Sequence, residues 1–137
     1  MRVYEHTLEF GWEGDNDLGI RLIQQIIEGK KTATCAPLFG YTEEELAAVI
    51  ASKGALVTVV DKEQRPWCNV RIVDVFQAPF GHPDPRLVRG EGDGDDIEKF
   101  QRDHQKDWKV WLETEGHSLT DDTSLVVEVF ELVEVAE

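Results

Sequence analysis

Two lysines and two threonines lie together at the end of an apolar segment with helical spacing, in the sequence Gly29-Lys30-Lys31-Thr32-Ala33-Thr34. A lysine serves as a base when burial or neighbouring charges lower its pKa, and a threonine hydroxyl attacks an acyl carbon once a base removes its proton. A structural interpretation is also open, because lysines favour the last turn of a helix and threonines favour strands. In an ideal strand Lys31 and Thr34 point to opposite faces, so they converge only if the segment bends.

A second candidate group is the glycine-rich acidic segment at 89–96, which reads Arg-Gly-Glu-Gly-Asp-Gly-Asp-Asp. Glycines let a backbone approach a ligand closely and leave a neighbouring carboxylate unshielded. The acidic residues oppose phosphate, and the segment has neither the lysine of a P-loop nor the ligand spacing of an EF-hand. We interpret Asp93, Asp95 and Asp96 as the acidic start of a helix. The role of Glu91 stays open.

The histidines and cysteines show no local metal-binding pattern. No two histidines are spaced i,i+4, and Cys35 and Cys68 form no close thiolate pair. We therefore expect no metal, no cofactor and no disulfide framework, in a reduced, cytoplasmic protein. His104 falls on the apolar stripe of a predicted helix and is interpreted as a packing residue. Cys68 is expected in the core.

The charge balance limits the partners. The 137 residues contain 28 Asp plus Glu against 14 Lys plus Arg, for a formal net charge of -14. Duplex DNA and long RNA are bound through arrays of Lys and Arg, so neither is an expected partner. One net-positive stretch, 64–90, contains Arg71 and Arg89. With Trp67 and Tyr41 as stacking surfaces it could accept one nucleotide, unless Trp67 is simply buried.

The elements that must position these residues follow from hydrophobic periodicity and from turn signals. The pattern predicts a single domain over 1–137 with a mixed α and β fold, and it does not choose between an open curved sheet and a small barrel. No apolar run approaches the ~20 residues of a membrane span. The predicted elements are a strand at 4–10, a helix at 18–27, a short helix opened by a capping box at 42–45, a hairpin of strands 55–60 and 67–76, a long irregular loop at 79–94, a helix at 97–112 and a closing strand at 125–135.

Several short motifs, taken in order along nearly the whole chain, resemble the ASCH domain family, whose fold is related to the PUA domain. The spacing Gly29-x-Lys31-x-x-Thr34 is similar to the family's G-x-K-x-x-T signature. The other matching motifs are Phe10-Gly11, Arg65-Pro66-Trp67-Cys68, Pro79-Phe80, Gly90-Glu91-Gly92-Asp93 and Phe130.

This resemblance implies an α+β fold, a small mixed or antiparallel β-barrel of PUA-like type with flanking helices. It also implies a cleft associated with RNA or modified nucleosides. Related bacterial members hydrolyse the amide of N4-acetylcytidine with a Lys, a Thr and a Glu, which correspond here to Lys31, Thr34 and Glu91. The expected reaction is the hydrolysis of an N4-acylated cytidine, with no cofactor. The residues expected to bind the substrate are Lys30, Tyr41, Lys53, Trp67, Arg71 and Arg89.

Two alternatives stay open beside this hydrolase. One is a non-catalytic or weakly nucleolytic binder of short single-stranded RNA, in which Tyr41, Lys53, Arg71 and Arg89 contact the strand around the same cleft. The other is a partner-binding module that uses the acidic surface. Neither the natural substrate nor the oligomeric state follows from the sequence.

Overall fold

The computed structural model describes residues 1–137 and contains one five-stranded sheet in the order β1-β3-β4-β5-β2. β1 pairs with β3 in parallel, and all other neighbours are antiparallel. The strands are β1 (Thr7–Phe10), β2 (Ala33–Pro37), β3 (Leu56–Asp61), β4 (Pro66–Pro79) and β5 (Ser124–Val135).

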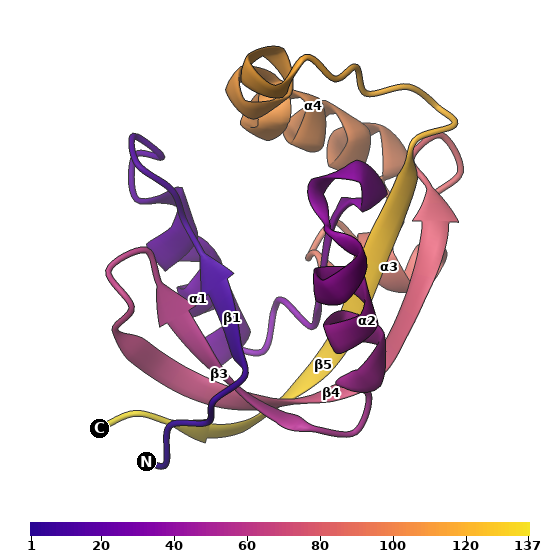
Figure 1. The fold of residues 1–137 in the computed structure, drawn as a ribbon. Helices are drawn as coiled ribbons and strands as arrows, with labels where there is room; N and C mark the ends of the chain where they lie inside the picture. Colours follow the sequence, from indigo (N-terminus) through magenta and orange to yellow (C-terminus); the bar gives the residue numbers. More distant parts are fainter.

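The long β4–β5 pair gives the sheet its curvature (Figure 1). Register shifts interrupt this pair at Asn69/Val70 and at Ile72/Asp74, and such irregularities bend and twist a strand pair. The edge strands β1 and β2 are not paired with each other, so the curved sheet is left open. The predicted α+β fold with flanking helices is confirmed, whereas the sheet does not close into the barrel that was expected.

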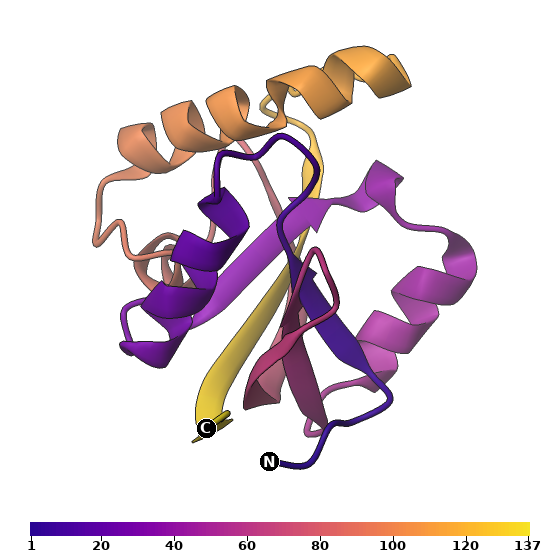
Figure 2. The ribbon, with the colours of Figure 1, turned by 90° about the vertical axis from the view of Figure 1, so that its left-hand side faces the viewer.

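The four α-helices are α1 (Leu18–Ile27), α2 (Glu43–Ala51), α3 (Pro85–Gly90) and α4 (Ile97–Glu115). α4 runs across the end of the sheet opposite the two chain termini, as Figures 1 and 2 both show. The capping box predicted at the start of α2 is present, because Thr42 and Glu45 each accept a hydrogen bond from the other's backbone. None of the helices is long and apolar enough to cross a membrane.

Two hydrophobic clusters hold α1, α3 and α4 against the sheet. The first joins Ile23 and Ile26 of α1 to residues of β1, β3, β4 and β5, and it includes Cys68, which is fully buried as expected. The second joins Leu87 of α3 and Phe100 of α4 to β2 and β5. β2 and β5 are therefore packed against α3 and α4 through the second cluster.

The predicted irregular loop at 79–94 is wrong in part, because it contains α3. Asp84 caps this helix by accepting a hydrogen bond from Arg86 N at 2.8 Å, and Pro85 occupies its first turn. A proline at the first helical position is favourable, since its missing N–H would have no partner there. Pro85 therefore starts a helix at a place where the sequence pattern indicated a break.

A candidate catalytic cavity at the open edge of the sheet

A cavity of about 510 Å³ lies where the open sheet leaves β1 and β2 unpaired, beside α1 and α4. Its volume is in the range of sites for small organic molecules. Lys31, Thr34 and Glu91 all line it. The apolar part of the lining consists of Leu8, Phe10, Trp12, Leu18, Leu22, Cys35, Ala36, Tyr41 and Trp108.

Lys31 reaches the cavity from a turn between α1 and β2. Gly29 ends the helix with a φ of 81°, a conformation that glycine adopts without strain. The backbone N–H of Lys31 then donates to Gln25 O at 3.1 Å, and β2 begins only at Ala33. Because Lys31 precedes the strand, strand alternation does not force it away from Thr34, and the two residues share one cavity.

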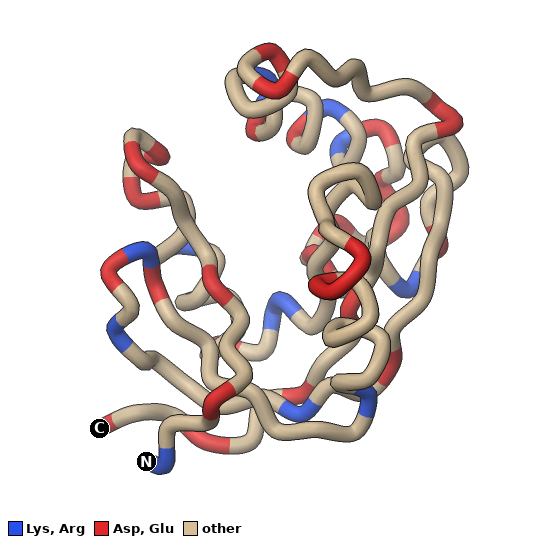
Figure 3. Tube along the Cα trace, viewed as in Figure 1, with Lys and Arg blue, Asp and Glu red and all other residues tan.

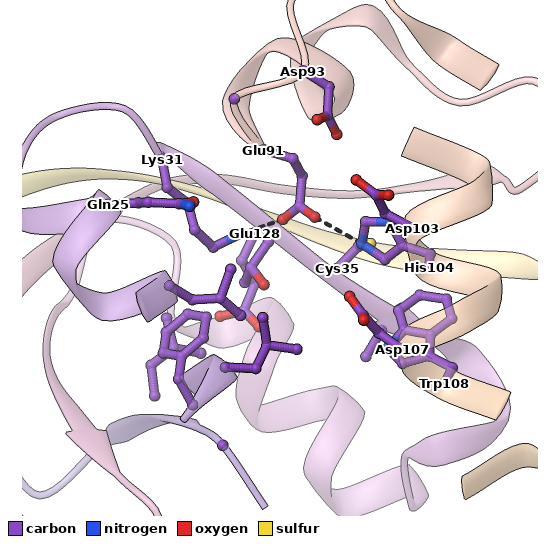
Figure 4. A pocket seen from close by; sticks show the side chains of 18 of the residues that line it. Gln25, Lys31, Cys35, Glu91, Asp93, Asp103, His104, Asp107, Trp108 and Glu128 are labelled. Atoms are coloured by element: carbon purple, nitrogen blue, oxygen red, sulfur yellow. Dashed lines mark hydrogen bonds and ion pairs between the residues drawn. The ribbon is translucent and has the colours of Figure 1, made fainter. Parts of the chain in front are cut away.

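The Lys31 ammonium is paired with the carboxylate of Glu91. The side chain of Lys31 is only 2% exposed and that of Glu91 only 9%. Nζ of Lys31 also donates to the carbonyl oxygen of Ala33 at 2.6 Å. Figure 4 shows the Lys31 ammonium and the Glu91 carboxylate facing each other in the wall of the cavity. In both contacts the lysine nitrogen is the hydrogen-bond donor, once toward a carboxylate and once toward a backbone carbonyl oxygen.

The close approach of Gly90 to Ala33 brings Glu91 to Lys31. A Cβ atom at Gly90 would overlap the side chain of Ala33, so only glycine allows this approach. The backbone N–H of Thr32 donates to Gly90 O at 2.7 Å. The end of α3 therefore packs against the start of β2, and Glu91, which follows Gly90, lines the cavity.

The second carboxylate oxygen of Glu91 contacts His104 of α4. Oε2 lies 2.7 Å from His104 Nε2, while His104 Nδ1 lies 2.8 Å from the carbonyl oxygen of Phe100. Because each ring nitrogen faces an acceptor, both carry a proton, and the ring is an imidazolium. The ring also packs against Phe100 with 4.3 Å between centroids. The interpretation of His104 as a packing residue is therefore incomplete.

The charges in this cluster shift one another's pKa values. Burial alone would raise the pKa of Glu91, but the charge of Lys31 and the hydrogen bond from His104 outweigh it and lower the pKa to about 2. Burial disfavours the charged form of His104, yet hydrogen bonds with Cys35 and Glu91 raise its pKa well above the usual value. Burial raises the pKa of the Cys35 thiol. Cys35 thus stays a neutral thiol beside a charged Lys–Glu–His chain.

Cys35, Glu91 and His104 also form a possible donor set for a metal ion, since their ligand atoms lie within 4.8 Å of one another. A metal bound there would have to displace the proton on His104 Nε2 and compete with Lys31 for the Glu91 carboxylate. This grouping has no signature in local sequence spacing, because the three residues come from separate segments that only the fold brings together.

Thr34 and Glu128 face the cavity from neighbouring strands. They are directly opposite each other in the antiparallel β2–β5 pair. The Thr34 hydroxyl makes no hydrogen bond to Lys31 or Glu91, although all three residues line the cavity. Glu128 is only 6% exposed, and burial raises its pKa to about 6. Glu128 is not among the residues predicted from the sequence. Its one distinguishing feature there is that it is a single carboxylate within a run of valines.

The residues expected to bind the substrate fall into two groups. Lys30 and Tyr41 line the cavity. Lys53, Trp67, Arg71 and Arg89 do not. The structure gives these four other partners, namely Asp74 for Lys53 at 3.3 Å, Asp61 for the Trp67 indole at 2.8 Å, the Gly54 carbonyl for Arg71 at 2.9 Å and Asp95 for Arg89 at 2.9 Å.

The cavity is lined by more acidic than basic side chains. Lys99 at its rim is bonded to Asp93 at 2.8 Å and to Asp103 at 2.7 Å. Asp107 and Glu128 add carboxyl groups whose pKa values are raised by burial. Figure 3 shows that acidic residues are distributed over the whole chain, with basic residues between them. An anionic ligand would therefore be repelled.

The open, curved sheet with its flanking helices defines a PUA-like α+β domain. A sequence model of the ASCH domain matches residues 8–134, so the chain belongs to the ASCH domain family, and the resemblance noted from the motifs is confirmed. No curated protein matches the sequence.

Two crystal structures share this fold. One is of a protein from Enterococcus faecalis, with a TM-score of 0.79 and 24% identity, over 98% of this chain and 80% of that chain. The other is an ASCH domain from Lactobacillus crispatus, with a TM-score of 0.73 and 20% identity, over 96% of this chain and 82% of that chain.

Proposed function

We propose that the protein hydrolyses the amide of an N4-acylated cytidine or a closely similar nucleoside. The observation that carries this proposal is the buried Lys31, which is paired with Glu91 in a cavity that Thr34 also lines. These are the three positions that match the Lys, Thr and Glu of the amide-hydrolysing ASCH proteins.

The cavity suits a neutral nucleoside better than a nucleotide. Its volume of about 510 Å³ can hold a base with its sugar. Phe10 and Trp108 offer apolar ring surfaces against which a base can pack. The carboxyl groups of Asp107 and Glu128 would repel a phosphate. The proposed substrate therefore carries its acyl group on the base and no phosphate on the sugar.

In the proposed reaction Thr34 attacks the acyl carbon and forms an acyl-threonine, which water then hydrolyses. The Lys31 ammonium donates a hydrogen bond to the acyl oxygen as negative charge develops there. Glu91 holds Lys31 in place, and His104 in turn holds Glu91 through its second oxygen. Water is the only co-reactant, so this hydrolysis needs no cofactor.

Binding of short single-stranded RNA is the competing proposal, since ASCH proteins are associated with RNA. The basic residues expected to contact a strand, Lys53, Arg71 and Arg89, lie outside the cavity and already have acceptors. Salt separates the two functions, because binding through several phosphates weakens steeply with ionic strength and binding of a neutral nucleoside does not.

The proposal is tested by following acid release from a panel of acylated nucleosides. We expect activity towards N4-acetylcytidine that Thr34→Val and Lys31→Met remove. Lys53→Met is the matched control, since it removes the same charge at an exposed position outside the cavity. Wild-type protein that is inert towards the whole panel would overturn the proposal, as would a Thr34→Val variant with wild-type rates.

A further inference from the structure

The proposed reaction requires a group that takes the proton of Thr34, and neither Lys31 nor Glu91 is suited to that task. Lys31 already donates to Ala33 O and forms an ion pair with Glu91, so its nitrogen acts as a donor and is not placed to accept the Thr34 proton. Glu91 has a pKa of about 2, because Lys31 and His104 favour its charged form against the effect of burial. A carboxylate held in this way is a weak base near neutral pH.

Glu128 is a buried carboxyl group without a protein partner. The residue is 6% exposed, and its side chain makes no hydrogen bond or ion pair with a protein group, so burial is the one cause that shifts its pKa. No fully buried side-chain oxygen in the protein lacks a partner, so the Glu128 oxygens must be open to the cavity that the residue lines. Figure 4 shows the Glu128 side chain within this cavity, together with Lys31 and Glu91. A buried carboxylate without a partner lowers the free energy of unfolding, so its presence is explained if it interacts with a substrate or a reacting atom.

Strand register places Glu128 beside the nucleophile. Thr34 and Glu128 are directly opposite each other, and Phe130 N donates to Thr32 O at 2.9 Å two positions away in the same ladder. Opposite residues of an antiparallel pair project to the same face with their Cβ atoms about 5 Å apart. At this spacing the Thr34 hydroxyl and the Glu128 carboxylate can meet directly or through one water.

We infer that Glu128 is the general base that activates Thr34, an assignment that rests on the proposed function. Its carboxylate accepts the hydroxyl proton while the Thr34 Oγ1–carbon bond forms. The carbon–nitrogen bond then breaks, and Glu128 returns the proton to the N4 nitrogen, which releases cytidine and leaves acyl-Thr34. Water attacks the acyl carbon, its proton passes through Glu128 to Thr34 Oγ1, and the carboxylic acid departs.

The protonation behaviour of Glu128 is compatible with this role. Burial is the cause that raises its pKa to about 6, and a base is most effective when its pKa lies near the working pH. Burial raises the pKa of the Tyr41 phenol, and the charge of Glu128 raises it further. The other titratable groups that line the same cavity are Glu9, Lys30, Lys31, Cys35, Glu91, Asp93, Lys99, Asp103, His104 and Asp107.

The test compares wild-type protein with Glu128→Gln and Glu128→Asp on N4-acetylcytidine across pH. We expect Glu128→Gln to lower kcat about 100-fold or more, with KM changed only a few-fold. Wild-type kcat/KM should fall as the pH drops below about 6, and this fall should be absent from the residual activity of Glu128→Gln. Glu128→Asp, which keeps a carboxylate at a longer distance, should retain an intermediate rate.

Two results would overturn the assignment while leaving the proposed function intact. One is an active wild type whose kcat survives Glu128→Gln within about threefold, against the loss that a general base predicts. The other is a raised KM with unchanged kcat, which would make Glu128 a binding residue only. An inert wild type is a different result, because it removes the proposed function and the base assignment with it.

Discussion

Lys31 and Glu91 are 60 positions apart in the sequence, yet their charged groups form a buried pair in one cavity wall. The turn after α1 supplies the lysine, and the end of α3 supplies the glutamate. Two contacts of Gly90, with Ala33 and with Thr32, fasten these segments together. The pair is therefore a product of the tertiary fold, and the stability of the fold should depend on it.

Lys31→Met should destabilise the protein, because it leaves the Glu91 carboxylate buried with one partner fewer. Removing one member of a buried pair costs about 3 kcal/mol or more. The double variant Lys31→Met/Glu91→Gln, which leaves no unpaired carboxylate, should recover part of this loss. Denaturant unfolding measures both free energies. A single variant as stable as the wild type would show that the pair contributes nothing.

Gly90→Ala should disturb the site from a distance, because its new methyl group would overlap Ala33. We expect a lower melting temperature and a loss of the activity that depends on Lys31 and Glu91. Arg89→Ala is the neighbouring control, since that side chain is exposed and bonded only to Asp95. Equal melting temperatures for the two variants would argue against the close packing of α3 on β2.

His104 should titrate well above 6.5, its ordinary pKa, because the hydrogen bonds with Cys35 and Glu91 outweigh burial. Since the folded pKa is raised, the stabilisation from His104 is complete below about pH 6.5 and is lost as the pH rises through the folded pKa. NMR of the ring protons against pH measures the midpoint. Glu91→Gln should shift it downwards. A wild-type midpoint at or below 6.5 would contradict the ion pair.

Glu128→Gln should stabilise the protein at pH 8. The folded pKa of Glu128 is raised from 4.5 to about 6, so the ionised carboxylate is costly in the folded state above pH 6. The gain should approach about 2 kcal/mol at pH 8 and vanish near pH 4, where the carboxyl is neutral in the folded protein. Thermal melts at the two pH values measure this difference. A variant less stable than wild type at pH 8 would mean that the carboxylate has a protein partner.

The elements defined by local pattern were predictable from the sequence. Apolar spacing located α1 and α4, and the capping box located α2. α3 was missed, because a six-residue helix is too short to show periodicity and its Pro85 resembled a break. The open edge between β1 and β2 also could not be foreseen, since the hydrophobic pattern of a strand does not tell whether its outer edge is paired.

The candidate site was predictable only where a sequence motif marked it. The spacing of Lys31 and Thr34 and the glycines around Glu91 singled these three residues out, and all of them line the cavity. His104 and Glu128 carry no such mark, because their positions in the site depend on helix packing and strand register. These long-range arrangements leave no trace in local sequence spacing.

The hydrolase activity is measured by following the conversion of N4-acetylcytidine to cytidine and acetate with wild-type protein, by NMR at neutral pH. We expect equal amounts of the two products, formed at a rate that Thr34→Val reduces to the uncatalysed background while the fold is retained. Unchanged N4-acetylcytidine after prolonged incubation with folded wild-type protein would contradict the proposed hydrolase function.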